Sequence, residues 1–178
     1  MKICIDPGHG GKDPGAVGTS PFILEEKEFN LKLSLLLEEK LKALGHWVIM
    51  TRRKDRFLKL TSRANFANRL NVDLFVSIHA NSAVLPEVSG MEVFHFTNSE
   101  KGRKFAVTIL ENMLREFPEH KDRGVKEADF VVLRETRMPA VLVESEFLSN
   151  PQELKFLADP ENQISLASAI ARGIDQSF

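Results

Sequence analysis

Two histidines lie at or just beyond the ends of short apolar runs, and they are the residues best suited to chemistry in this chain. His9 follows the run at residues 2–6, and His79 ends the run at residues 72–78. A third run, residues 140–143, ends on Glu144. Such runs indicate buried strands, and in an open parallel sheet ligands gather at the carboxyl ends of the strands. Because imidazole nitrogens and carboxylates bind Zn²⁺ and move protons, the pattern predicts a zinc hydrolase.

Residue types and spacing do not identify the third metal ligand. A catalytic zinc site needs three protein ligands and a free position, so a carboxylate must join His9 and His79. Three candidates, Glu25, Glu26 and Glu28, open the first predicted helix. Carboxylates at that position are also stabilised by the helix dipole, by about 0.3–1 kcal/mol. Spacing therefore selects none of the three glutamates. It also leaves open that they only stabilise the start of the helix and bind no metal.

Glu144 is predicted to be buried, because apolar residues precede and follow it in the sequence. Burial raises the pKa of a carboxyl group, and a glutamate tuned in this way suits general acid–base catalysis near neutral pH. The alternative is a buried ion pair with an arginine. His9 could likewise be a structural loop residue without a ligand role, and His79 could be a core histidine. The remaining histidines are predicted to be structural or solvated: His46, His95 and His120.

The elements that must position these residues alternate between strands and helices. Strands are predicted at residues 2–6, 47–51, 72–78, 91–96, 130–133 and 140–144. Helices are predicted at residues 27–44, 61–70, 100–116, 151–157 and 163–175. Residues 7–21 form a long glycine- and proline-rich loop, which is typical of function, and residues 118–122 form a surface loop. The alternation predicts an α/β fold, with a mostly parallel twisted sheet between helices in three layers and a single domain over 1–178.

Composition excludes several classes of protein. With 43% apolar residues and a net charge of −1, the 178-residue chain is neither disordered nor strongly basic. We therefore expect no nucleic-acid partner, and no apolar run is long enough for a membrane span. Cys4, the one cysteine, is predicted to be a core residue. The chain opens directly into a strand without a signal peptide, so we expect an excised domain or export by another route. We also expect a monomer.

Two rival active sites are disfavoured by missing motifs. Gly11-Lys12 is followed by Asp13, and the glycine spacing before it does not fit a phosphate-binding loop. A Gly-x-Ser-x-Gly elbow, which would indicate a serine hydrolase, does not occur. A metal-free binding module and another zinc amidohydrolase or peptidase remain as alternatives.

A family resemblance runs from Lys2 to about Ile174. It is carried by successive motifs, which are Asp6-Pro7-Gly8-His9-Gly10-Gly11, Glu26-Lys27 with Asn30-Leu31, Thr51-Arg52, Ser77-Ile78-His79-Ala80-Asn81, Met138 to Glu144, and Phe147-Leu148-Ser149-Asn150. In this order they resemble the zinc-dependent N-acetylmuramoyl-L-alanine amidases of the amidase-3 type. The resemblance implies a six-stranded sheet, Zn²⁺ as cofactor and cell-wall peptidoglycan as substrate.

The resemblance also implies roles for individual residues. His9, Glu26 and His79 match the zinc ligands, and Glu144 matches the catalytic glutamate. The bond cut would be the amide between the lactyl group of N-acetylmuramic acid and L-alanine, at the cell wall and outside the cytoplasm. One residue departs from the family pattern, because Glu146 stands where glycine is usual. We expect Glu146 to share a face with Glu144 and to raise its pKa further.

The segment after the His-Ala-Asn motif predicts an open site. Some relatives carry an inserted helix there that covers the zinc site. Here only residues 82–89 separate Asn81 from Gly90. That is too few for a helix with its two connections, since helices average about 11–12 residues. We expect a groove without a lid that accepts an extended peptide.

Overall fold

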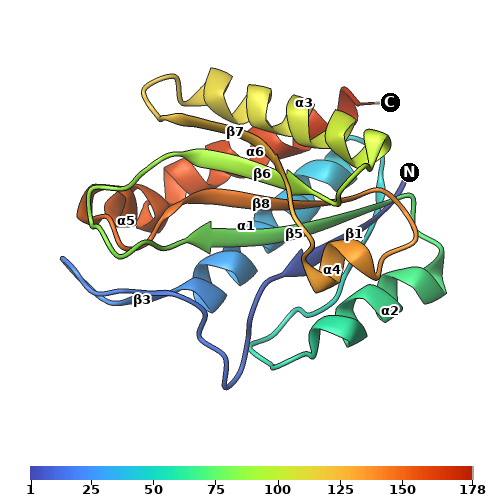
Figure 1. The fold of residues 1–178 in the computed structure, drawn as a ribbon, viewed down its shortest axis with the longest axis horizontal. Helices are drawn as coiled ribbons and strands as arrows, with labels where there is room; N and C mark the ends of the chain where they lie inside the picture. Colours follow the sequence, from blue (N-terminus) through green and yellow to red (C-terminus); the bar gives the residue numbers. More distant parts are fainter. Residues whose placement is uncertain (178) are drawn as a thin grey trace.

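A six-stranded sheet forms the middle layer of the computed structural model, which describes residues 1–177 (Figure 1). Its strands follow the order β4 (Trp47–Met50), β1 (Lys2–Pro7), β5 (Leu74–Asn81), β8 (Ala140–Phe147), β6 (Met91–His95) and β7 (Asp122–Glu127). Neighbouring strands are parallel except for β6 and β8, which are antiparallel. The predicted α/β class and mostly parallel sheet are confirmed.

Helices cover both faces of the sheet. One face carries α1 (Glu26–Ala43), α3 (Glu100–Glu116), α5 (Pro151–Ala158) and α6 (Pro160–Asp175). The other face carries α2 (Leu60–Leu70) and the single turn α4 (Val131–Arg134). α6 begins three residues before its predicted start, because Pro160 is favourable at the first helical position and Asp159 accepts hydrogen bonds from the next two free amides. No helix in the described part of the chain is both long and apolar enough to span a membrane.

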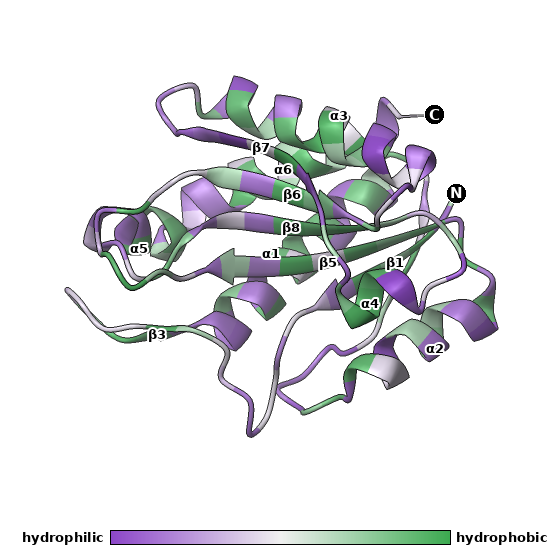
Figure 2. Ribbon diagram, in the orientation of Figure 1, coloured by the Kyte–Doolittle hydropathy of each residue, from purple (hydrophilic) through white to green (hydrophobic). Residues whose placement is uncertain are grey.

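The central strands are apolar on both faces, as expected where helices pack on each side. Ile3, Ile5 and Val76 point into the core under α1, α3 and α6. Cys4 and Phe75 alternate with them and point into the smaller core under α2 and α4, so the predicted core position of Cys4 is confirmed. Figure 2 shows hydrophobic colour along much of β1, β5 and β8.

Two predictions on the later part of the chain were wrong. Residues 130–133 are not a strand: Val131 to Arg134 form one helical turn, which buries Val132 and Leu133 against α2 and the sheet. A strand at 122–127, β7, was missed, and Asp122 belongs to it rather than to a loop. As a partly exposed edge strand, β7 lacks the apolar run that reveals a buried strand. Its hydrophilic start is visible in Figure 2.

The long loop after β1 carries a short β-structure. Val17–Gly18 (β2) pairs in an antiparallel sense with Leu24–Glu25 (β3), so the loop is not structureless as predicted. Hydrogen bonds from Glu26 N to Ala16 O and from Lys27 N to Pro14 O then fasten the loop to the first turn of α1. This packing brings the start of α1 to the carboxyl ends of the central strands.

Candidate active site

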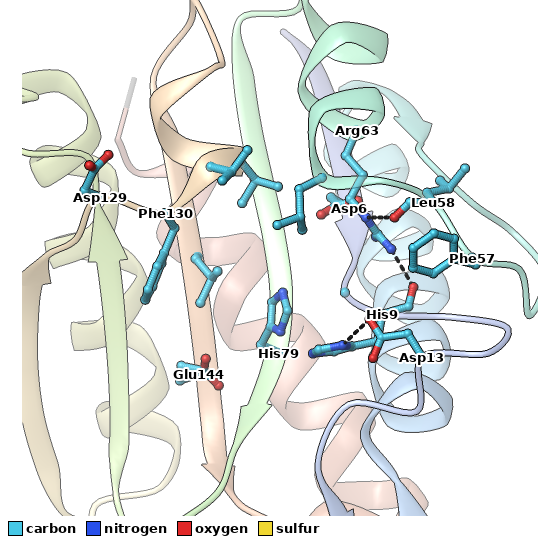
Figure 3. A pocket seen from close by; sticks show the side chains of 15 residues that line it. Asp6, His9, Asp13, Phe57, Leu58, Arg63, His79, Asp129, Phe130 and Glu144 are labelled. Carbon is cyan, nitrogen blue, oxygen red and sulfur yellow. Dashed lines mark hydrogen bonds and ion pairs between the residues drawn. The ribbon is translucent and has the colours of Figure 1, made fainter.

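Three adjacent strands bring the predicted site residues to one edge of the sheet. His9 lies two residues beyond β1, whereas His79 and Glu144 are register partners on β5 and β8. Figure 3 shows the two histidines side by side and Glu144 next to His79. The rings of His9 and His79 meet edge to face, with centroids 5.1 Å apart.

Glu26 joins the two histidines from the first turn of α1. Its Oε2 lies 3.1 Å from His9 Nε2, and its Oε1 lies 2.8 Å from His79 Nδ1. The ligand atoms of the three residues all lie within 4.8 Å of one another. Glu25 instead pairs with Lys27, 3.0 Å away. The geometry thus singles out Glu26, a choice that sequence spacing could not make.

The charges of this cluster suit a cation. Burial would raise the pKa of Glu26, but hydrogen bonds from His79 and His9 hold that pKa well below its usual value. Burial would lower the pKa of His9, but Glu26 and Asp13 raise it overall. A buried carboxylate thus stays ionised between two ring nitrogens. Two nitrogens and a carboxylate are a donor set that Zn²⁺ commonly accepts, so the residues fit the metal that the family resemblance implies.

Asp13 orients His9 and was missed by the sequence reasoning. Its Oδ2 lies 2.9 Å from His9 Nδ1. A proton on Nδ1 donated to Asp13 would leave Nε2 as the nitrogen that binds a metal ion in place of its own proton, which is the tautomer a metal ligand needs. Burial would raise the pKa of Asp13, whereas the bonds from His9 and Gly15 lower it, so it stays ionised. A carboxylate four residues after a candidate ligand, in the same glycine loop, is a signal that could have found it.

Glycines leave the space in which these side chains meet. A Cβ on Gly8 would lie 2.2 Å from the His79 ring. A Cβ on Gly15, whose φ is +69°, would lie 2.4 Å from Glu26 Oε2 and 2.7 Å from His9 Cδ2. Side chains at either position would therefore displace the ligands.

Two buried arginines hold the backbone of the His9 loop. Arg63, from α2, donates to His9 O at 2.6 Å and to Pro7 O at 2.7 Å. Arg52 donates to Pro7 O at 3.0 Å and to Gly8 O at 2.8 Å. His9 itself has a φ of +60°, which is uncommon for a residue with a side chain. The arginines thus stabilise the conformation that directs His9 into the site. Nothing in the α2 sequence predicted this role for Arg63.

Asp6 neutralises Arg63 within this network. Its carboxylate accepts hydrogen bonds from Arg63 at 2.9 Å, from Thr51 at 2.5 Å and from Ser77 at 2.9 Å. These polar residues, Arg63 apart, belong to the motifs that carry the family resemblance. Their buried contacts explain what those motifs do: they join β1, β5 and α2 beneath the candidate site.

Glu144 carries an unsatisfied oxygen at the site. Its Oε2 is closed to solvent and has no hydrogen-bond partner among the described residues. Burial, followed by the charges of Glu26 and Glu92, raises the pKa of Glu144 well above its ordinary value. The alternative of an ion pair with an arginine is wrong for the described chain. A carboxyl group in this environment can exchange a proton with a bound reactant.

Glu146 does not share a face with Glu144, contrary to prediction. His79 pairs with Glu144, but Asn81 pairs with Phe147, so β8 has one extra residue between these points. Such a β-bulge reverses the alternation of side chains. Glu146 accordingly contacts His120 and Glu153 instead of the groove. The charge that raises the pKa of Glu144 comes from Glu26 and Glu92, not from Glu146.

Asn81 contacts a carboxylate on β6, Glu92, rather than the candidate metal ligands. Its Nδ2 donates to Glu92 Oε1 at 2.6 Å, and Glu92 also pairs with Arg123 and Lys126. Glu92 is the register partner of Glu144 on β6. Asn81 and the two cations thus keep a second carboxylate in place beside Glu144.

A groove of about 620 Å³ opens over the site (Figure 3). His9, His79 and Glu144 lie at its polar end. Apolar side chains form its two walls: Phe57, Leu58 and Leu60 near α2, and Phe130, Val131 and Val132 at α4. The residues that line it include none from 82–90, and that segment contains no helix, so the predicted absence of an inserted helix is confirmed.

Comparison with known proteins identifies the family of this chain. The N-acetylmuramoyl-L-alanine amidase family (Amidase_3) matches residues 3–176. The sporulation-specific N-acetylmuramoyl-L-alanine amidase of Bacillus subtilis is 34% identical over 100% of this chain and 68% of its own length. An N-acetylmuramoyl-L-alanine amidase of Clostridium difficile 630 superposes with a TM-score of 0.94 at 33% identity, over 98% of this chain and 95% of that one.

A second solved structure is similar in the same way. The catalytic domain of CwlV, an amidase from Bacillus (Paenibacillus) polymyxa var. colistinus, has a TM-score of 0.90 and 40% identity, over 98% of this chain and 96% of that one. Fold and family match define a hydrolase built on a mostly parallel sheet between two layers of helices. The chain belongs to the amidase-3 family of N-acetylmuramoyl-L-alanine amidases, enzymes that degrade cell-wall peptidoglycan.

Proposed function

We propose that this chain cleaves the amide between the lactyl group of N-acetylmuramic acid and L-alanine, with Zn²⁺ held by His9, Glu26 and His79 and with Glu144 as general base. The observation that carries the proposal is the unpartnered, buried Glu144 oxygen in the same groove as the two histidines. Peptidoglycan lies outside the cytoplasmic membrane, so the site of action would be extracytoplasmic.

The roles of the residues follow from their positions. Zn²⁺, when bound, would supply Lewis acidity to the scissile carbonyl and to the attacking water. Glu144 takes the proton of that water, which its raised pKa favours, and returns it to the nitrogen of L-alanine as the amide breaks. Asp13 holds His9 in the ligand tautomer, and Arg63 holds its backbone. The apolar walls of the groove exclude water from an extended peptide.

Glu144→Gln separates metal binding from chemistry. The substitution keeps the shape of the side chain but removes the base, so zinc should still bind while hydrolysis falls by about 10²–10⁴-fold. Metal content and the release of fragments from purified peptidoglycan, followed by mass spectrometry, measure the two effects. Loss of zinc in this variant would make Glu144 a ligand and contradict the assignment.

The same mass spectra identify the bond. Hydrolysis at the proposed amide yields glycan strands without peptide and stem peptides with a free L-alanine amine. Peptides cut internally, with the link to the sugar intact, would instead indicate a zinc peptidase on the same scaffold. His79→Ala, which lacks a proposed ligand, should be inactive in either case and serves as the control.

A further inference from the structure

A second cluster of metal-binding side chains lies away from the groove, and it includes the residue that departs from the family pattern. His120 comes from the turn between α3 and β7, Glu146 from the end of β8, and Glu153 from the first turn of α5. Each residue offers one ligand atom, and these atoms lie within 4.8 Å of one another. The α3–β7 turn thus meets the consecutive elements β8 and α5 at one point.

The spacing of these atoms resembles that of the candidate catalytic cluster. His120 Nδ1 lies 2.9 Å from Glu146 Oε1 and 3.4 Å from Glu153 Oε2. The corresponding distances at His9, Glu26 and His79 are 3.1 and 2.8 Å. Zinc bonds of about 2.0–2.2 Å in tetrahedral geometry place neighbouring ligand atoms about 3.3 Å apart. Both clusters have donor atoms close to that spacing.

Each of the two innermost side chains is held so that one atom is directed at the centre. Glu146 is fully buried, and its Oε2 accepts hydrogen bonds from Gly90 N at 2.7 Å and Phe147 N at 3.2 Å. Its Oε1 is thereby fixed toward His120. The His120 ring is packed against Phe117 and Phe156, with centroids 5.8 and 4.3 Å away. These contacts preorganise a ligand site, because neither side chain can rotate away without losing them.

The charge of the cluster is unbalanced without a cation. Two carboxylates approach one imidazole, and their ion pairs within residues 1–177 are with His120 alone. A protonated His120 would still leave one negative charge in excess, at a place where Glu146 is closed to water. A divalent ion with a neutral imidazole would balance both carboxylates.

We propose that His120, Glu146 and Glu153 form a second, structural metal site for Zn²⁺ or a divalent ion with the same ligand preference. Bound there, the ion would clamp the α3–β7 turn and α5 to the end of β8. Partly exposed Glu153 leaves a route for the ion and for a water ligand. Exposed Glu119, whose Oε1 is 3.7 Å from His120 Nε2, would support the ring from outside. The proposal does not depend on the assignment of the catalytic residues.

Zinc stoichiometry tests this site directly. The chain is stripped with a chelator, dialysed against low micromolar Zn²⁺ and assayed for bound metal. The wild-type chain should hold two ions, His79→Ala and His120→Ala one each, and the double variant none. His46→Ala is the matched control, since His46 also pairs with a carboxylate, that of Asp175 at 3.1 Å, outside both clusters; it should hold two. The same zinc content in the wild-type chain and in His120→Ala would overturn the proposal, whatever the number of ions in the wild-type chain.

Thermal unfolding gives a readout that does not involve activity. Ligand binding to the folded state raises the melting temperature, so Zn²⁺ should stabilise His79→Ala but not the double variant. Glu153→Gln, at a partly exposed position, replaces His120→Ala if that variant fails to fold, and it too should bind one ion. If Zn²⁺ raised the melting temperatures of His79→Ala and of the double variant by the same amount, the second site would be refuted. His120→Ala should keep its hydrolytic activity, so failure of this proposal and failure of the amidase proposal are distinguishable.

Discussion

At the scale of single residues, the site depends on which nitrogen of each histidine faces Glu26. His9 directs Nε2 and His79 directs Nδ1 toward that carboxylate. Asp13 determines the first of these choices, because it binds the opposite nitrogen of the His9 ring. The orientation of His9, a proposed ligand, therefore rests on Asp13, which is not itself a proposed ligand.

Asp13→Asn should weaken zinc binding. The amide cannot fix the required tautomer as the carboxylate does, and loss of such an outer partner typically costs about 10–100-fold in metal affinity. Competition with a chromophoric chelator measures the change. Asp55→Asn is the control, since Asp55 binds Gly11 N of the same loop at 2.6 Å without touching a ligand. Equal affinities of the two variants would argue against an orienting role for Asp13.

As the proposed general base, Glu144 should make the reaction depend on pH. A base must be ionised to accept a proton, and the pKa of Glu144 lies above the ordinary 4.5 because of burial and of the charges of Glu26 and Glu92. Activity should therefore fall as the pH drops through this raised pKa. The measurement is kcat/KM against pH with zinc kept saturating. An acid limb with an apparent pKa at or below the ordinary glutamate value would contradict the role of Glu144 as base.

At the scale of elements, the loop between β1 and α1 shapes the site by what it leaves out. Its glycines at 8 and 15 leave room for His79, Glu26 and His9, and its short pairing of β2 with β3 anchors it to α1. The bulge in β8 acts at the same scale, because it separates Glu144 in the groove from Glu146 in the second cluster. One strand thereby contributes to both proposed sites.

Gly15→Ala should impair metal binding beyond its effect on stability. An alanine in the left-handed region costs about 1–2 kcal/mol wherever it occurs. A Cβ on Gly45, whose φ is +85°, would meet no heavy atom within 4 Å, so Gly45→Ala shows that conformational cost alone. Unfolding and zinc titration of both variants separate the effects. Similar zinc affinities would show that the loop can yield without moving Glu26 or His9.

At the scale of the whole molecule, the groove is open to a polymeric substrate. The segment 82–90 is held at the end of the sheet, where Ala83 N donates to Ser149 at 3.0 Å and Gly90 N donates to Glu146 at 2.7 Å. It does not line the groove. Within the described residues, nothing in this segment covers the candidate metal ligands.

The chain supplied with zinc should therefore clear purified cell walls without a partner protein. The loss of turbidity of a wall suspension measures this, and Glu144→Gln in the same assay shows how much of the clearing is enzymatic. Dependence on an added activator would mean that the groove, although open, is not competent by itself.

The sequence by itself determined the layered fold and most of the candidate catalytic residues. Apolar runs mark the central strands because both faces of those strands are buried, and turn residues mark their ends. His79 and Glu144 could be placed at one edge because parallel strands end together. The edge strand β7 was missed because partial exposure removes the apolar run that marks a buried strand. The helical turn α4 was predicted as a strand because a single apolar turn resembles a short strand in sequence.

Only the tertiary structure decided the choices that depend on contacts between distant segments. It brought Asp13 and Arg63 to His9 and left Glu144 without an arginine. It also placed Glu26 between the two histidines, a choice that the family resemblance implied but that spacing left open. It also turned Glu146 from the groove toward His120, through one extra residue in β8. Periodicity predicts side-chain direction along a regular strand, but a bulge changes that direction, and no spacing rule reveals which loop will fold back onto it.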